Sequence, residues 1–341
     1  SLQFLNDPKN AYRHFYNLYQ GVVTPLSLSR GAYWAGRAAE KNSNPDIAQS
    51  WYFAATKYPT TFYGQLAARK LGKKTLEFPK QPNFTDGDVN NYHTNELVKA
   101  GFIAHNLDRS SDAKKFFKAA IESAKSLGEV RLITDLGAQI ERPDYGIDAA
   151  KEVSKSGLIL TDAHYPVLPT IKNPRTKKEI TAPERALVHG IILQESAFYH
   201  KARSHADAMG LMQIIPKTAR HLAKKLHLGY SESKLMEKNP SYNVTLGSKY
   251  LDELIQGWDG SYILAIASYN AGPLNVRKWV NQNGNPREFK NHEQIVDWIE
   301  QIPFAETRSY VMRVMENLQI YRHALGEDSK PTIRLIEDLK R

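Results

Sequence analysis

The chain has 341 residues, 41% of them hydrophobic and 10% aromatic, as in folded globular proteins that form two or three domains. Its lack of cysteine excludes disulfides, thiolate catalysis and sulfur-ligated zinc, and fits an oxidising compartment. The net charge of +10 is spread along the chain, with 19 basic and 15 acidic groups in residues 1–150 and 27 and 21 in the rest, so attraction to an anionic polymer is indicated and a nucleic-acid partner is not.

The first residues, Ser1-Leu2-Gln3, have neither the basic nor the apolar region of a secretory signal peptide, so we expect that signal to be absent from this chain. No later stretch approaches the roughly 20 apolar residues that a membrane-spanning helix needs. We therefore predict no transmembrane segment.

The first ~75 residues are predicted to be helical. Residues 32–39 and 50–55 share a pattern of aromatic residues followed by alanine, in which small side chains let neighbouring helices approach. Asn44-Pro45 separates the two segments. This pattern is typical of a helical-repeat, superhelical platform.

Residues 78–87 contain Pro, Asn and Asp and are predicted to be a linker, followed by a second helical block from about Asn91 to Ser156. Residues 164–183 contain four prolines and the basic residues Lys172, Arg175, Lys177 and Lys178, which indicates a junction or exposed loop. We therefore divide the chain into a helical-repeat region (1–78), a helical linker domain (79–163) and a C-terminal domain (164–341). Helices are expected in the last at 216–226, 244–256, 262–270, 274–281 and 307–325, so the fold class is all-α.

Glu195 is the first candidate for chemistry. It follows Leu187, Ile191 and Ile192 at helical spacing, which places its carboxyl near the buried face of a helix. Burial raises the pKa of a carboxyl, so that it can hold a proton near neutral pH as a general acid. Taken alone, the residue is more simply interpreted as a helix-end glutamate in a salt bridge, and the surrounding motifs decide the matter.

Four motifs follow one another in order. They are Gln194-Glu195-Ser196-Ala197-Phe198 with Ser204 behind it, Gly210-Leu211-Met212-Gln213-Ile214, Ala267-Ser268-Tyr269-Asn270-Ala271-Gly272-Pro273, and Ile302-Pro303-Phe304-Ala305-Glu306-Thr307-Arg308-Ser309-Tyr310-Val311. Over residues 183–325 the chain resembles the soluble lytic transglycosylases, relatives of goose-type lysozyme. The resemblance implies a lysozyme-like α domain that cleaves the β-1,4 bond between N-acetylmuramic acid and N-acetylglucosamine in peptidoglycan and leaves 1,6-anhydromuropeptides.

The resemblance also implies a role for each matching residue. Glu195 would be the catalytic acid and then the base. Substrate-binding residues would be Ser204, Gln213, Tyr269, Asn270, Glu306 and Met212. Ser204 would contact the N-acetyl group or Glu195, Gln213 would donate hydrogen bonds to the glycan, and Glu306 would line the groove. The sequence departs from the family's usual residues at Met209, Ile215 and Ser268, none of which is the acid/base.

Two alternatives remain open. A goose-lysozyme-like muramidase would hydrolyse the same bond and would need a second group to activate water, for which Asp207 is the candidate. A non-catalytic glycan-binding scaffold is the other.

No His-Glu-x-x-His pairing or phosphate-binding loop is present in the sequence, so neither metal nor cofactor is expected. The expected partners are peptidoglycan strands, with cell-wall or secretion-machinery proteins as further candidates. We expect a monomer in the periplasm.

Overall fold

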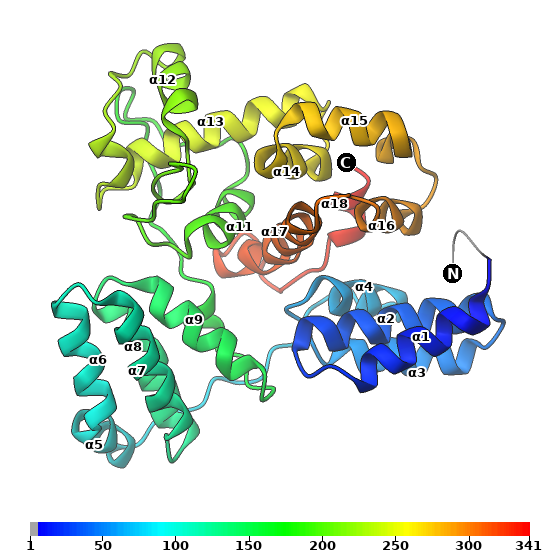
Figure 1. Ribbon diagram of the computed structural model, residues 1–341, viewed down its shortest axis with the longest axis horizontal. Coiled ribbons are helices and arrows are strands. Elements are labelled where there is room, and N and C mark those ends of the chain that lie inside the picture. The colour runs from blue at the N-terminus through cyan, green and yellow to red at the C-terminus, as the bar shows by residue number, and fades with distance from the viewer. Residues whose placement is uncertain (1–5) are drawn as a thin grey trace. The chain divides into compact units, whose positions relative to one another are not determined.

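The structure is a computed structural model that describes residues 6–341. Its regular elements over that range are helices, accompanied by isolated β-bridges but no strand, so the predicted all-α fold class is confirmed. The first four helices, α1 (Pro8–Gln20), α2 (Pro25–Lys41), α3 (Pro45–Thr56) and α4 (Phe62–Lys70), pack each against the next along the chain (Figure 1). Proline occupies the first turn of α1, α2 and α3, where its missing N–H is not needed.

Small residues allow α2 and α3 to lie close together. Ala32, Ala35 and Ala38 are completely buried. A Cβ atom placed on Gly36 would lie 2.7 Å from the ring of Tyr52 on α3, which is closer than any side chain tolerates. The aromatic-and-alanine pattern predicted from the sequence therefore forms a helix–helix contact, in which aromatic rings fill the space between closely packed backbones.

Residues 78–166 form a compact unit of their own, together with the short segment 196–199. Its helices are α5 (Asp86–Thr94), α6 (Glu96–Asn106), α7 (Ser110–Glu122), α8 (Leu127–Gln139), α9 (Pro143–Ser154) and the single turn α10 (Thr161–His164). Phe117, Ile133, Leu136 and Tyr145 are central to its core. Gly101 lies against Phe117, where a Cβ would be 2.3 Å from the ring.

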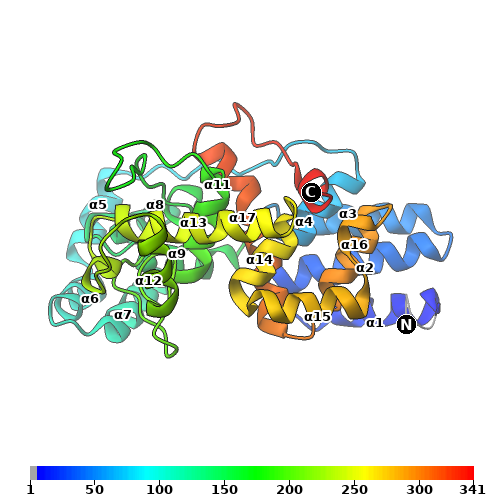
Figure 2. The same cartoon turned by 90° about the horizontal axis from the view of Figure 1, so that it is seen from above.

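The other unit consists of residues 6–77, 167–195 and 200–341. Its C-terminal part holds α11 (Arg185–Ser196), α12 (Pro216–Lys225), η1 (Ser233–Met236), α13 (Ser241–Gly257), α14 (Tyr262–Ala271), α15 (Pro273–Asn283), η2 (Pro286–Glu288), α16 (His292–Glu300), α17 (Ala305–Ala324) and α18 (Leu335–Leu339). Helix α14 is the centre of this part and packs against α13, α15 and α17 (Figure 2). The five helices expected here are present within a few residues of their expected ends, whereas α16 and α18 were not expected.

The division into three domains at residues 78 and 163 remains a prediction about separately folding segments. No helix among the described residues is long and apolar enough to cross a membrane.

Candidate active site

Glu195 lies in the last turn of α11, after a run of buried apolar residues that anchors the helix. Its carboxyl is largely shielded from water. Burial raises the pKa of Glu195 from 4.5 to about 7, a hydrogen bond from Tyr310 opposes the rise, and the charge of Glu306 adds to it. The carboxyl can therefore be protonated or ionised near neutral pH, as a group that first gives and later takes a proton requires.

Tyr310 is the residue in contact with this carboxyl that sequence reasoning did not assign. Its hydroxyl donates a hydrogen bond to Glu195 Oε1 at 2.5 Å, from the middle of α17. Tyr310 is 4% exposed, and burial together with the charge of Glu195 holds its own pKa well above the ordinary value, so it stays a neutral donor. Its position in the fourth motif was the sequence feature that could have identified Tyr310 as a residue of this site.

The loop from 200 to 215 is held against α13 by Asn243, another residue that the sequence did not single out. The Asn243 amide donates to the carbonyls of Met209 at 2.9 Å and Leu235 at 3.0 Å, and its oxygen accepts from the N–H of Met212 at 2.9 Å. Asn243 is 2% exposed, so these bonds satisfy a buried polar group completely. They fix the Gly210-Leu211-Met212-Gln213 turn.

Tyr269 reaches the same loop from α14. Its hydroxyl donates to the carbonyl of Met212 at 2.7 Å. Burial, and next the charge of Glu195, raise the pKa of Tyr269 well above its ordinary value, which locates Tyr269 near the acid. The backbone of Met212 is thus bound at both ends, by Asn243 and Tyr269, and its side chain is completely buried against Gly247.

Gln213 has a positive φ of 47° and turns its amide back onto the loop. Its Nε2 donates to the carbonyls of Ala202 at 3.0 Å and Gly210 at 2.8 Å. Both amide hydrogens are therefore in use, and the oxygen is the part of this amide left to accept a hydrogen bond.

Ser204 and Asp207 lie on the exposed part of the loop. The Ser204 hydroxyl accepts from the N–H of Ala206 at 3.2 Å and of Ala208 at 3.0 Å, which shapes the turn. Asp207 is paired with Arg203, whose Nε donates to its carboxyl at 2.9 Å. Neither side chain forms a hydrogen bond with Glu195.

Asn270 and Glu306 belong to neighbouring segments. The buried Thr307 hydroxyl donates to Asn270 Oδ1 at 2.6 Å and so ties the end of α14 to the first turn of α17. Glu306 stands next to Thr307 in that turn and is exposed, yet near enough for its charge to act on Glu195. The third and fourth motifs therefore meet beside the acid.

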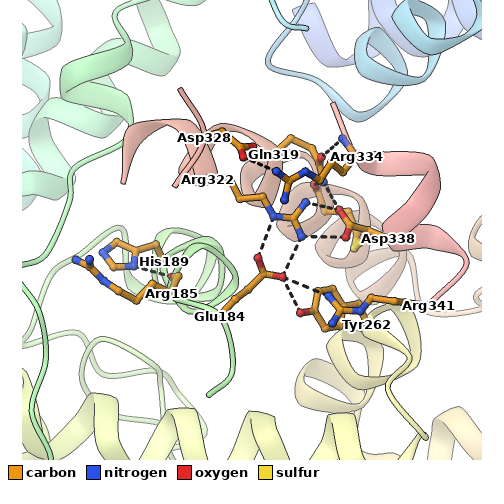
Figure 3. Close-up of polar contacts among 11 residues, drawn as sticks. Glu184, Arg185, His189, Tyr262, Gln319, Arg322, Asp328, Arg334, Asp338 and Arg341 are labelled. Atoms are coloured by element: carbon orange, nitrogen blue, oxygen red, sulfur yellow. Dashed lines mark hydrogen bonds and ion pairs between the residues drawn. The ribbon is translucent and has the colours of Figure 1, made fainter. Parts of the chain in front are cut away.

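The start of α11 is anchored by a buried ion network (Figure 3). Arg322 donates to Glu184 through Nε at 2.9 Å and Nη2 at 2.9 Å, and to Asp338 through Nη1 at 2.7 Å. Tyr262 adds a 2.6 Å hydrogen bond to Glu184. Glu184 directly precedes the helix, which begins at Arg185, and its carboxyl is bound by Arg322 of α17 and Tyr262 of α14.

A single protonatable carboxyl, a neutral phenol bound to it and a backbone-braced loop beside it can support acid/base cleavage of an acetal. Within residues 6–341 no cluster of three or more His, Asp or Glu side chains could hold a metal ion.

Residues 172–292 match the family described as the transglycosylase SLT domain, and residues 301–330 match the soluble lytic transglycosylase helical domain. The soluble lytic murein transglycosylase of Escherichia coli K12 is 29% identical over 278 residues, covering 80% of this chain and 40% of that protein. The protein of the same name from Salmonella typhimurium LT2 is 36% identical over 137 residues, covering 40% of this chain and 20% of that protein.

Among solved structures, the lytic transglycosylase Slt of Pseudomonas aeruginosa, in an inactive mutant form, shares the fold with a TM-score of 0.68 at 23% identity, over 94% of this chain and 50% of that one. The chain thus spans half or less of the length of each of these relatives. The predicted resemblance to the soluble lytic transglycosylases is confirmed by these matches.

Proposed function

We propose that the protein is a lytic transglycosylase that cleaves the β-1,4 bond between N-acetylmuramic acid and N-acetylglucosamine in peptidoglycan, with Glu195 as its one acid/base. The proposal rests chiefly on the half-buried Glu195 carboxyl, whose pKa burial raises to about 7 and which receives a hydrogen bond from the neutral phenol of Tyr310. The relatives named for murein transglycosylase activity support the substrate.

In the first step, protonated Glu195 gives its proton to the glycosidic oxygen, and the bond from that oxygen to C1 of N-acetylmuramic acid breaks. The carbonyl oxygen of the neighbouring N-acetyl group supplies electrons to C1. In the second step, ionised Glu195 takes the proton of the C6 hydroxyl while O6 forms a bond to C1 and displaces the N-acetyl oxygen. No water is consumed. The intramolecular attack gains from proximity, which is worth on the order of 7–11 kcal/mol in well-oriented systems.

The surrounding residues keep the groups in place. Tyr310 orients the Glu195 carboxyl, and Tyr269 fixes the loop that faces it through Met212. Gln213 would receive a hydrogen bond from a sugar hydroxyl or N-acetyl N–H, because its own hydrogens are bound to the loop. Ser204 and Asn270 would contact the N-acetyl group and the ring, and Glu306 would line the groove. Met212 would shape the site from its buried position.

The hydrolytic alternative needs Asp207 to activate water. Its carboxyl is exposed and already paired with Arg203, so it is not held in the direction that a general base for water requires. The geometry therefore favours the lytic reaction. With this substrate, the protein would act in the periplasm on peptidoglycan strands.

Mass spectrometry of muropeptides released from purified cell wall tests this proposal. Products should be one water lighter than hydrolysed muropeptides, should resist borohydride reduction and should carry no label from heavy-oxygen water. Reducing, labelled products would establish hydrolysis with Asp207 instead, and binding without cleavage would establish a scaffold.

Glu195→Gln should lower turnover by roughly 100-fold or more, because glutamine cannot exchange a proton. Glycan binding should persist, because glutamine is nearly isosteric with glutamate. Glu288→Gln, on the exposed η2 turn, is the matched control and should retain wild-type turnover. Residual activity of Glu195→Gln above a tenth of wild type would remove Glu195 from the mechanism.

A further inference from the structure

The segment directly after Glu195 has an uncommon backbone. Ala197 and Phe198 have φ values of +48° and +61°, so two consecutive residues with side chains occupy the left-handed region. This conformation costs free energy for any residue with a Cβ, and it persists only where surrounding contacts hold it. Something must therefore secure the turn that ends the catalytic helix.

The contacts of this segment identify what secures it. Ser196–Tyr199 packs as part of the compact unit formed by residues 78–166, although Glu195 and residue 200 belong to the other unit. Phe198 is 4% exposed. The centre of the Tyr199 ring lies 4.1 Å from the guanidinium carbon of Arg142, which immediately precedes α9.

Arg142 is itself held rigidly. Its Nε and Nη2 donate to the two carboxyl oxygens of Asp144 at 2.8 and 2.9 Å, and its Nη1 donates to the Ser110 hydroxyl at 2.9 Å. The ring of Tyr145 lies 4.0 Å from the same guanidinium carbon. Arg142 is 8% exposed, so these cation–aromatic contacts form in a largely desolvated place, where they are strongest.

We propose that Arg142 is a positioning residue for Glu195 and acts through Tyr199. By fixing the Tyr199 ring it holds the left-handed turn at 197–198, and that turn sets the direction in which the last turn of α11 presents the Glu195 carboxyl to Tyr310. The inference rests on the proposed function. A lysine cannot replace Arg142, because its ammonium lacks the planar fork that binds Asp144 while stacking on aromatic rings.

The test separates kcat from KM on soluble glycan fragments for Tyr199→Phe, Tyr199→Leu and Arg142→Lys. Tyr199→Phe keeps the ring and should stay within about two-fold of wild type. Tyr199→Leu and Arg142→Lys should lower kcat about 10- to 100-fold with KM nearly unchanged, since small misplacements of a reacting group cost rate on this scale. Arg131→Lys, at a cation–aromatic pair with Phe84 in the same unit, is the matched control and should behave as wild type.

A pH profile supplies a readout that a merely structural role would not change. Tyr310, Tyr269 and Glu306 are the titratable groups that act on or are acted on by Glu195. A carboxyl released toward water loses the burial that raises its pKa, so the alkaline limb of kcat should move to lower pH in Tyr199→Leu and Arg142→Lys. Tyr199→Phe should leave it in place.

Circular dichroism gives the folded fraction of each variant, and kcat is expressed per folded molecule. The proposal is overturned if Tyr199→Leu and Arg142→Lys keep the wild-type kcat and pH profile and only their melting temperatures fall. If one of them does not fold, the other decides. If Tyr199→Phe loses as much activity as Tyr199→Leu, the ring contact is not the cause and the proposal also fails. Failure of the proposed function looks different, since the wild type would then yield no anhydro product.

Discussion

Glu195 and Tyr310 act as a pair at the scale of single residues. The hydroxyl stabilises the ionised carboxyl, burial and the charge of Glu306 stabilise the protonated one, and the resulting pKa of about 7 is a balance of these effects. Tyr310→Phe removes the hydrogen bond, which should raise the pKa of Glu195 further. Glu306→Gln removes a neighbouring negative charge, which should lower it.

In the proposed mechanism the first step needs protonated Glu195, so the rate should fall as pH rises through the pKa of this group. The alkaline limb of the pH–kcat profile should therefore move up in Tyr310→Phe, by about one pH unit for a hydrogen bond to a charged group. It should move down in Glu306→Gln. Profiles that shift together, or not at all, would show that Glu195 does not control that limb.

At the scale of elements, the loop that carries Gly210 is built around one close contact. Gly210 has a φ of +75°, and a Cβ on it would lie 2.0 Å from the carbonyl oxygen of Leu235. Gly272, at the junction of α14 and α15, has a φ of +81° but no atom within 4 Å of such a Cβ. Both glycines therefore have a positive φ, but only Gly210 has no room for a Cβ atom.

Alanine at these two positions separates strain from collision. Gly272→Ala should cost about 1–3 kcal/mol, because its φ of 81° and ψ of 145° lie in a region essentially restricted to glycine. Gly210→Ala should cost clearly more, above about 3 kcal/mol, because the 202–214 loop must also move away from Asn243 and η1. Denaturant unfolding measures both. Equal losses would mean that the loop yields freely and that Asn243 does not hold it.

At the scale of the whole molecule, residues 6–77 supply partners to buried groups of the C-terminal helices in the same unit. Arg37 is paired with Asp297 at 2.6 Å, with 10% and 8% of these side chains exposed. The carboxyl of Glu316, 3% exposed, accepts from the N–H of Phe62 at 2.5 Å. Although the four motifs all follow residue 183, helices α16 and α17 therefore depend on residues 6–77 for partners of buried groups.

A truncation starting near residue 164 should consequently fail to fold stably, since it removes Arg37 from Asp297 and the N–H of Phe62 from Glu316. A milder test compares the free energies of unfolding of Arg37→Ala and Arg109→Ala in the full chain. Breaking the buried pair should cost about 3–5 kcal/mol. The exposed pair of Arg109 with Asp112 should matter by less than about 1 kcal/mol. A truncated domain with wild-type stability would contradict this account.

The sequence by itself determined the all-α class and singled out Glu195 as the proposed acid. Both depend on local order: helical spacing after Leu187 is enough to turn Glu195 toward the interior, and motifs are by nature contiguous. The positions of most catalytic-domain helices followed from the same periodicity. Helix α16 was missed, although Asn291 caps it and Gln294 completes a capping box.

Only the tertiary structure decided what those residues touch. Tyr310 meets Glu195 across 115 residues of chain, and Asn243 meets Met212 across 31. Gln213 was expected to donate to a sugar, yet its amide hydrogens are bound to the loop, and Met212 was expected at the glycan yet is buried. Such pairings depend on which distant side chains folding brings into low-dielectric contact, where a satisfied hydrogen bond or ion pair outweighs any local preference.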